Sequence, residues 1–371
     1  MRVLIDALGI QRPGGGRTAT LNLLQGLATL DSGDEWVVLL SGREPTLENA
    51  RRLRQVVLPL ASRLAARVGA EVVLPALAAR SRADLIHHSK NLMTLASPCP
   101  RVTTLYDLTI LARPDLYPAL DVTYWRHVEP WLLRRASRVI AISETTARDL
   151  EAHYGIGTPQ VCVVYPGIDP VFTPVGGPDT ETLRRYGLEP GYALHVGSIS
   201  RKKNLLPLVK AVESLNSRHQ HLKLALVGRV YDKSYDGALF EYIRSRGLES
   251  VVRLTGPVPQ VDLPDLYRGA GVFVFPSVHE GFGLVPVEAM ACGVPVVSSA
   301  GGALREVLGG AALMLPDASD AAALAEAIRI AASDGPERRG LIQRGFERAR
   351  RYSREESVCQ TVAIYRSLAR R

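Results

Sequence analysis

The sequence predicts an α/β protein made of two doubly wound domains, and three observations support this. The chain has 371 residues, which suits two domains of about 170 residues better than one core. Short runs of β-branched residues alternate with helical segments, as in parallel sheets. A segment with four prolines and three glycines, Pro166 to Pro178, separates the two series. We therefore expect an N-terminal domain over residues 1–170, a linker over 171–178, a C-terminal domain over 179–353 and a terminal helix over 354–371.

The first half begins with a strand, a glycine-rich loop and a helix. Gly14-x-Gly16-x-x-Ala19 matches the dinucleotide fingerprint in form, but about six residues separate it from the end of the first strand at Ala7. The spacing therefore disfavours NAD and favours a glycine loop that closes over a substrate. Further strands are expected at 36–40, 56–58, 85–87, 102–105, 139–142 and 161–164, and helices at 17–30, 62–80, 122–136 and 144–154.

Polar residues follow three of these strands, at the sheet edge where ligands of doubly wound folds collect. They are His88 to Asn91, Tyr106 to Leu108 and Ser143 to Thr145. The simplest role for Ser143 is a helix N-cap.

Positive charge is concentrated in the first half of a chain with a formal net charge of +8. Between Arg51 and Arg101 nine Lys or Arg residues face two acids, Glu71 and Asp84. Such an excess fits nucleic acid, anionic lipid or a phosphorylated ligand. No zinc finger, basic zipper or RNA-binding aromatic pattern is present, so we expect no nucleic-acid partner.

The helix expected at 62–80 carries Leu64, Val68 and Val72 on one face and is interrupted at Pro75. The favoured interpretation is that this apolar face packs on the sheet. Peripheral contact with an anionic membrane is the alternative.

In the second half, three consecutive cations follow the strand at 192–196, where a helix ending near Ser217 begins. Arg201, Lys202 and Lys203 are either a solvated cluster or a holder for a diphosphate. Strands at 222–227 and 251–254 lead to loops containing Arg229 and Val258, which either form the nucleobase side of a site or are ordinary connecting loops. A short helix is expected at 262–268, and 303–308 follows a Gly-Gly turn.

The segment 272–298 reads as strand, loop, helix and strand, with elements at 272–275, 284–292 and 294–297. Gly281 and Gly283 let the backbone approach a ligand, and the free N–H groups near Leu284 suit a phosphate. Glu280 in the loop and Glu288 in the helix can accept hydrogen bonds from sugar hydroxyls. The simpler alternative is a glycine turn with a capping acid.

The pattern Glu-x7-Glu, framed by EGFGL and EAMACGVPVV, resembles the signature of the retaining glycosyltransferases of family 4, the group 1 glycosyltransferases. That resemblance covers nearly the whole chain and implies the GT-B fold, in which two Rossmann-like doubly wound domains face each other across a cleft. It also implies that the C-terminal domain binds a nucleotide sugar, that the N-terminal domain binds the acceptor, and that the terminal helix at 354–371 crosses back to the N-terminal domain.

The resemblance also implies roles for individual residues of this chain, at the positions that match the family pattern. The resemblance implies the donor-binding residues Ser198, Lys202, Lys203, Arg229, Val258, Glu280, Gly281, Phe282, Gly283, Leu284 and Glu288. It implies Glu280, Lys203 and Asp107 as catalytic residues and Gly15, Gly16, Tyr106 and Asp107 as acceptor-binding residues. Two positions depart from the family pattern: Tyr106 stands where many relatives have histidine, and Ser198 where some have arginine. The acceptor-side base is therefore left open, as is the role of Glu280 as nucleophile or stabiliser.

The resemblance implies a retaining hexosyltransferase that moves mannose or glucose from a nucleotide diphosphate sugar to a glycan or lipid-linked acceptor in cell-surface polysaccharide synthesis. We expect neither cofactor nor metal, since the chain lacks Asp-x-Asp. We expect a cytoplasmic protein, with peripheral contact at the inner face of the membrane as an option. The alternatives are an epimerase or phosphorylase with the same architecture and a nucleotide-binding module without turnover.

Overall fold

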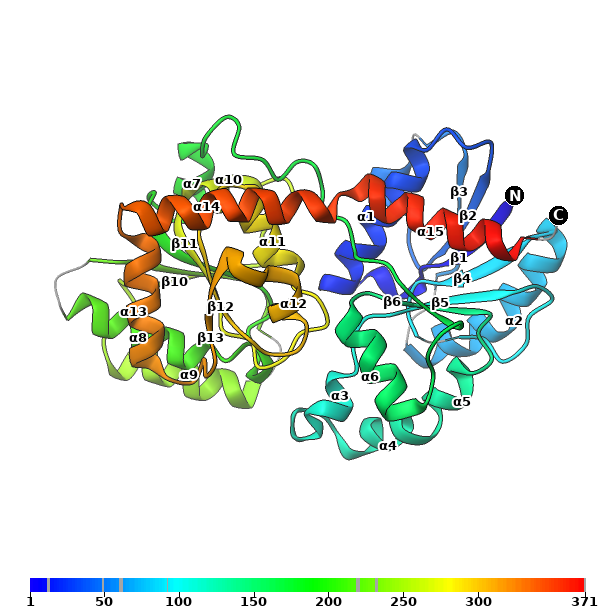
Figure 1. Ribbon diagram of the computed structural model, residues 1–371, viewed down its shortest axis with the longest axis horizontal. Helices are drawn as coiled ribbons and strands as arrows, with labels where there is room; N and C mark the ends of the chain where they lie inside the picture. Colours follow the sequence, from blue (N-terminus) through cyan, green and yellow to red (C-terminus); the bar gives the residue numbers. More distant parts are fainter. Residues whose placement is uncertain are drawn as a thin grey trace. The chain divides into compact units, whose positions relative to one another are not determined.

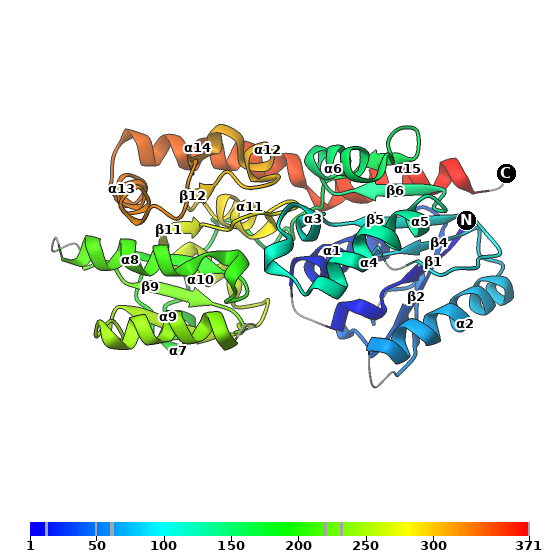
Figure 2. The ribbon, with the colours of Figure 1, turned by 90° about the horizontal axis from the view of Figure 1, so that it is seen from below.

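The computed structural model describes residues 1–11, 14–48, 50–59, 63–91, 93–217, 221–230 and 233–369. The chain forms two compact units. Unit 1 comprises Met1–Gly167 and Tyr352–Arg371, and unit 2 comprises Ile168–Arg351. Each unit is a parallel sheet with helices on both faces (Figures 1 and 2), which confirms the prediction of two Rossmann-like domains.

Unit 1 contains a seven-stranded sheet in the order β3-β2-β1-β4-β5-β6-β7, and every pair is parallel. The order reverses between β1 and β4, where Asp6 lies in register with His88. This pair of strands is therefore the topological switch point of unit 1. The strands are β1 Arg2–Asp6, β2 Glu35–Leu40, β3 Leu53–Val57, β4 Leu85–His88, β5 Arg101–Leu105, β6 Arg138–Ala141 and β7 Val161–Val163.

Helices cover both faces of this sheet because alternate strand residues are apolar on each side. One core joins the sheet to α1 and α15 and buries Val358, Val362 and Tyr365 of the terminal helix. Another joins the opposite face to α2. The helices of unit 1 are α1 Gly15–Thr29, α2 Arg63–Ser81, α3 Thr109–Ala112, α4 Ala119–His127, α5 Glu129–Leu133, α6 Glu144–Tyr154 and α15 Arg354–Leu368. Ser143 caps α6 as expected, since its Oγ accepts from the Thr146 N–H at 3.0 Å.

Two helix predictions in unit 1 are wrong in detail. The single helix expected at 122–136 is two helices, α4 and α5, because Pro130 at the start of α5 lacks the N–H that a continuous helix would need. Helix α2 instead continues through Pro75.

The packing face of α2 also differs from the expectation. Val68 and Val72 are 58% and 68% exposed, and the helix packs on the sheet through Ala70, Leu74 and Ala78. The side chain of Leu64 lies outside the described residues. The sheet-facing stripe is thus the i, i+4, i+8 row of two alanines and a leucine, and the two valines face solvent.

Unit 2 contains a six-stranded parallel sheet in the order β10-β9-β8-β11-β12-β13. Its switch point lies between β8 and β11. The strands are β8 Tyr192–Val196, β9 Leu224–Val227, β10 Val252–Gly256, β11 Ala270–Phe275, β12 Val296–Ser299 and β13 Ala312–Leu315. The helices are α7 Thr180–Arg185, α8 Leu205–Asn216, α9 Lys233–Ser245, α10 Leu263–Gly269, α11 Leu284–Ala291, α12 Leu304–Leu308, α13 Ala321–Ala332 and α14 Pro336–Ala349.

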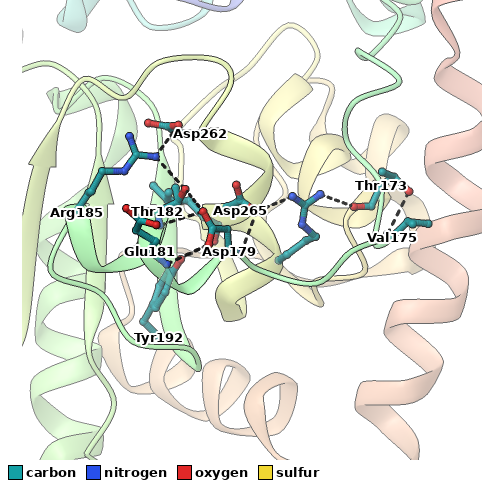
Figure 3. Close-up of polar contacts among 11 residues, drawn as sticks. Thr173, Val175, Asp179, Glu181, Thr182, Arg185, Tyr192, Asp262 and Asp265 are labelled. Atoms are coloured by element: carbon teal, nitrogen blue, oxygen red, sulfur yellow. Dashed lines mark hydrogen bonds and ion pairs between the residues drawn. The ribbon is translucent and has the colours of Figure 1, made fainter.

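Polar contacts fasten residues 173–185, which include the end of the proline-rich stretch, to helix α10 and the residue before it (Figure 3). The Asp179 carboxylate caps α7 by accepting from the N–H groups of Glu181 and Thr182, and its own N–H donates to Asp265 Oδ1 at 3.0 Å. Arg268 bonds both the Thr173 carbonyl, at 3.2 Å, and Asp265, at 2.6 Å. Residues 173–185 are thereby positioned by α10.

None of the helices in the described parts of the chain combines the length and the apolar character needed to cross a membrane.

Candidate functional site

The loops that follow β8 and β11 meet at the switch point of unit 2. These strands are hydrogen-bonded neighbours, with Ala193 opposite Val272 and Leu194 opposite Phe273. Both loops therefore leave the same edge of the sheet side by side, where doubly wound folds bind ligands.

A charged pair joins the two loops. Lys203 Nζ donates to Glu280 Oε1 at 2.6 Å, and Lys202 Nζ lies 3.7 Å from Glu280 Oε2. The side chains of Lys203 and Glu280 are 14% and 13% exposed. The Lys203 ammonium also lies 4.6 Å from the centre of the Phe275 ring. The structure thus brings together two adjacent cations and a carboxylate that lies 77 residues after Lys203 in the sequence.

A buried histidine lies beneath this pair. The His195 ring stacks on Phe275 at a centroid distance of 5.7 Å, and its Nδ1 donates to the Val274 carbonyl at 3.0 Å. Burial lowers the pKa of His195 to about 4, so the ring is neutral at pH 7. Its Nε2 is a buried acceptor with no hydrogen-bond partner among the described residues.

Close backbone contacts fix the loops around the pair. A Cβ on Gly228 would lie 1.8 Å from the Gly197 carbonyl oxygen, and one on Gly302 would lie 2.2 Å from the Glu280 carbonyl oxygen. The Glu280 carbonyl accepts from the Ala303 N–H at 2.8 Å. Glycine is required at both positions, which also have positive φ angles. The site is therefore preorganised by the main chain.

The start of α11 faces the same edge of the sheet. Gly283 adopts φ 103° immediately before Leu284, the first helical residue, while Gly281 and Phe282 are buried. The first N–H groups of α11 lack helical partners, so this segment can receive a phosphate.

Glu288 lies within α11 and is 2% exposed. Its Oε2 accepts from the Tyr267 hydroxyl at 2.9 Å. Burial raises the pKa of Glu288 to about 7, and burial together with this carboxylate raises that of Tyr267 well above its usual value. Glu288 therefore titrates near neutral pH, while its predicted ribose contact stays a prediction.

The other predicted donor residues follow β8, β9 and β10, along the same edge of the sheet. Ser198 Oγ lies 3.4 Å from Ser200 Oγ, Arg229 is exposed, and Val258 is half-buried. The Gly228 N–H donates to the Gly256 carbonyl at 3.0 Å, which joins two of these loops.

Unit 1 has a different arrangement at its own switch point. His88 Nδ1 lies 3.2 Å from Asp6 Oδ2, and Lys90 Nζ donates to the Gly9 carbonyl at 2.9 Å. A carboxylate only accepts hydrogen bonds, so Nδ1 carries the proton. The Nε2 of His88 is buried and has no hydrogen-bond partner among the described residues.

Tyr106 connects the strand edge to the first glycine loop. Its hydroxyl donates to the Gly16 carbonyl at 3.2 Å and lies 2.9 Å from Thr20 Oγ1. Burial raises the pKa of Tyr106 to about 12, so the phenol stays neutral and cannot replace a histidine base at pH 7. Asp107 Oδ1 accepts from the Thr109 N–H at 3.0 Å at the start of α3, and Gly15 is exposed at the start of α1.

Sequence reasoning missed three residues that belong to these sites. Asp6 ends β1, and only the pairing of β1 with β4 brings it to His88. His195 is the one polar residue of the β8 strand YALHV, and this was a usable signal. Tyr267 reaches Glu288 from a separate helix, which no local pattern indicates.

Nowhere in the described ranges do three His, Cys, Asp or Glu side chains gather in a way that could hold a metal ion.

Two family models match the chain. Residues 13–172 match Glycosyltransferase Family 4, and residues 183–348 match Glycosyl transferases group 1. The O-antigen chain mannosyltransferase B of Escherichia coli is 30% identical over 293 residues, which cover 78% of this chain and 76% of that protein. The D-inositol 3-phosphate glycosyltransferase of Nocardiopsis dassonvillei is 39% identical over 185 residues, which cover 47% of this chain and 43% of that protein.

Solved structures share the fold at lower identity. Sucrose-phosphate synthase from Thermosynechococcus elongatus superposes with a TM-score of 0.81 at 22% identity and covers 99% of both chains. Anabaena HepE in complex with UDP-glucose superposes with a TM-score of 0.78 at 20% identity, covering 99% of this chain and 100% of that one. The two models, the mannosyltransferase and the shared GT-B fold lead to one conclusion: this chain belongs to the family 4, group 1 glycosyltransferases.

Proposed function

We propose that this glycosyltransferase moves a hexose, mannose or glucose, from a nucleotide diphosphate sugar to a glycan or lipid-linked acceptor of cell-surface polysaccharide synthesis. The observation that carries the proposal is the contact between Lys203 and Glu280 at the switch point of unit 2. The mannosyltransferase relative and the UDP-glucose complex of HepE support this class of donor.

In the proposed reaction, negative charge grows on the diphosphate as it leaves the sugar. Lys203 and Lys202 supply positive charge beside the start of α11, and stabilisation of a leaving group by such preorganised charge is usually a large catalytic effect. Glu280 orients the Lys203 ammonium and would contact the donor sugar. We assign the nucleotide ribose to Glu288 on the basis of the family pattern.

We propose retention by front-face attack. The bond between the anomeric carbon and the phosphate oxygen breaks, and the acceptor oxygen bonds to that carbon from the same side. The acceptor proton passes to the departing phosphate oxygen, so no protein base is needed, which agrees with a neutral Tyr106. Charge stabilisation by Lys203 and Lys202 also makes a divalent metal unnecessary in this scheme.

On the acceptor side we propose Gly15, Gly16, Tyr106 and Asp107, and we add the pair Asp6 and His88. With Nδ1 donating to Asp6, the Nε2 of His88 is placed to accept a hydrogen bond from an acceptor hydroxyl. The exposed Val68 and Val72 of α2 support the proposal that a cytoplasmic enzyme contacts a membrane surface.

The test measures binding of UDP-, GDP- and ADP-sugars by calorimetry in EDTA, followed by product analysis with an acceptor. We expect one base family to bind, and Lys203→Ala to raise the Kd about 100-fold, or about 2.7 kcal/mol. The matched control is Lys223→Ala, which removes an equal charge from a surface pair with Glu189, 3.8 Å apart, and should leave the Kd unchanged.

Four outcomes would count against the proposal. Loss of binding in EDTA would exclude metal independence, and an inverted anomer in the product would exclude retention. Donor binding without turnover on any acceptor tested would favour a nucleotide-binding module, and isomerised donor without acceptor would favour an epimerase.

A further inference from the structure

A cavity lies at the edge of the unit 1 sheet opposite the one that carries Asp6 and His88. It has a volume of about 560 Å³ and opens where β1, β2 and β3 begin and α2 ends, at Arg2, Glu35, Leu53 and Arg80. All strands of this sheet are parallel, so their starts lie at the edge opposite Asp6 and His88. A strand of five residues spans about 17 Å. The cavity is therefore separate from the acceptor-side residues of unit 1, and we call it the arginine cavity.

Arginine dominates its lining. Five arginines reach it from two strands, a loop and a helix end: Arg2, Arg51, Arg52, Arg54 and Arg80. The acids in the lining are Asp34 and Glu35. The lining therefore has an excess of three positive charges. Four of the nine basic residues between Arg51 and Arg101 line this cavity, and the proposed transfer reaction does not use them.

The two acids already have partners. Asp34 bonds the Met1 ammonium at 2.8 Å and Arg366 at 3.3 Å, and Glu35 bonds Arg2 at 2.7 Å. Arg2 also donates to the Ser81 carbonyl. These acids are therefore not available to neutralise the other arginines.

Three guanidinium groups have no partner among the residues that the structure describes. Arg51, Arg54 and Arg80 are exposed, and within the described ranges their side chains form neither a hydrogen bond nor an ion pair. Arg52 Nη2 lies 3.7 Å from Asp31 Oδ1, and that carboxylate is 96% exposed. Like charges that line one cavity repel each other, and an anion bound between them would relieve this repulsion.

Purely structural roles explain two of the three arginines that have no partner among the described residues. Arg54 lies on β3, which is an edge strand, and charge on an edge discourages pairing with other chains. Arg80 in the last turn of α2 favours the helix dipole. Neither role explains why Arg51 joins them around a cavity of this size, which lies within the range of small-molecule sites.

We infer that the arginine cavity binds a compact polyphosphate, a diphosphate group either free or carried by a nucleoside, at a site distinct from the donor site. Guanidinium groups bind phosphate oxygens in pairs of parallel hydrogen bonds. A diphosphate carries about three negative charges, which would balance the three excess positive charges of the lining. A nucleoside diphosphate is also the product released by a nucleotide-sugar transferase, so the cavity would sense that product.

The test uses the full chain carrying Lys203→Ala, which removes the strongest cation of the donor site. Inorganic pyrophosphate and UDP are titrated by calorimetry in EDTA. We expect one site to remain and its Kd to rise at least tenfold when Arg51→Gln, Arg54→Gln and Arg80→Gln are added. If the two probes bind equally, the diphosphate alone is recognised; if UDP binds more tightly, the nucleoside contributes.

A matched triple variant, Arg43→Gln, Arg126→Gln and Arg148→Gln, removes the same charge from exposed positions of unit 1. It should leave the Kd within twofold, and thermal melts should show that both triples are folded. Absence of a site in the Lys203→Ala protein, or equal losses in the two triples, would overturn the inference. Neither result bears on donor binding by the protein with Lys203 intact, so failure here is distinguishable from failure of the proposed function.

Discussion

The two switch points of this protein have the same topology and different chemistry. In both sheets the neighbouring strands run in the order third, second, first, fourth. In unit 2 the loops after the first and fourth strands carry Lys203 and Glu280, whereas in unit 1 the first and fourth strands end in Asp6 and His88. The fold therefore decides where a ligand can bind, and a few side chains decide which ligand it is.

The two sites also differ in what holds their loops. In unit 2, backbone lies against backbone, as at Gly228 and Gly197, and the loops are joined by main-chain hydrogen bonds. In unit 1, a flexible side chain, that of Lys90, bonds the Gly9 carbonyl. Charge that must be stabilised in a transition state benefits from rigid placement, while contact with an acceptor tolerates adjustment.

The largest expected effect is on the free energy of unfolding, when one glycine at each switch point is replaced by alanine. Gly228→Ala should destabilise the protein by about 2 kcal/mol, because the new Cβ meets the Gly197 carbonyl and the φ angle is 147°. Gly9→Ala should cost less than about 0.5 kcal/mol, since only the end of the Lys90 side chain must move. Urea unfolding of both variants measures this, and equal losses would contradict the contrast in rigidity.

The next largest effect, about tenfold, should come from a substitution in unit 1 that changes use of the acceptor and leaves donor binding unchanged. Asp6→Asn keeps the shape of the side chain but lets an amide donate to His88 Nδ1, which moves the ring proton to Nε2. We expect the acceptor KM to rise about tenfold, or about 1.4 kcal/mol, with the donor Kd unchanged. Steady-state kinetics with varied acceptor and donor calorimetry test this. A change in the donor Kd with no change in the acceptor KM would contradict the proposal that Asp6 acts on the acceptor side.

The smallest effect concerns pH and is specific to unit 2. The pKa of Glu288 is raised to about 7, so its ionised fraction grows between pH 6 and 8. An ionised carboxylate accepts ribose hydroxyls better, and we expect nucleotide-sugar binding to tighten about fivefold over this range. Glu288→Gln should bind with a flat pH profile, and calorimetry at five pH values gives the result.

Stability should move in the opposite direction over the same range. A folded pKa above the unfolded value means that the native state binds more protons, so this contribution to the free energy of unfolding is present below pH 4.5 and is lost as pH rises through 7. Glu288→Gln has no carboxylate to ionise, so its free energy of unfolding should not show this decrease as pH rises. A wild-type binding profile that is flat, or that weakens with pH, would contradict the role given to Glu288.

The fold was largely predictable because its signals are local. Apolar runs separated by helical periods specify a doubly wound protein, and the strand-end positions of Lys203 and Glu280 follow directly from them. The errors arose where local signals compete: Pro75 is tolerated within α2 while Pro130 begins a new helix, and Val68 and Val72 looked like a packing face. Only contact with the sheet selects Ala70, Leu74 and Ala78 instead.

The sequence by itself determined the family, the two-sheet architecture and the segments at which ligands are expected, because these depend on residue order and periodicity. The tertiary structure decided which side chains meet. It brought Lys203 to Glu280 and Asp6 to His88 through strand pairing, and it raised the pKa of Glu288 through burial. It also gathered Arg51, Arg54 and Arg80 around one cavity from a loop, a strand and a helix end. Distances and desolvation depend on the packing of remote segments, and no local pattern encodes them.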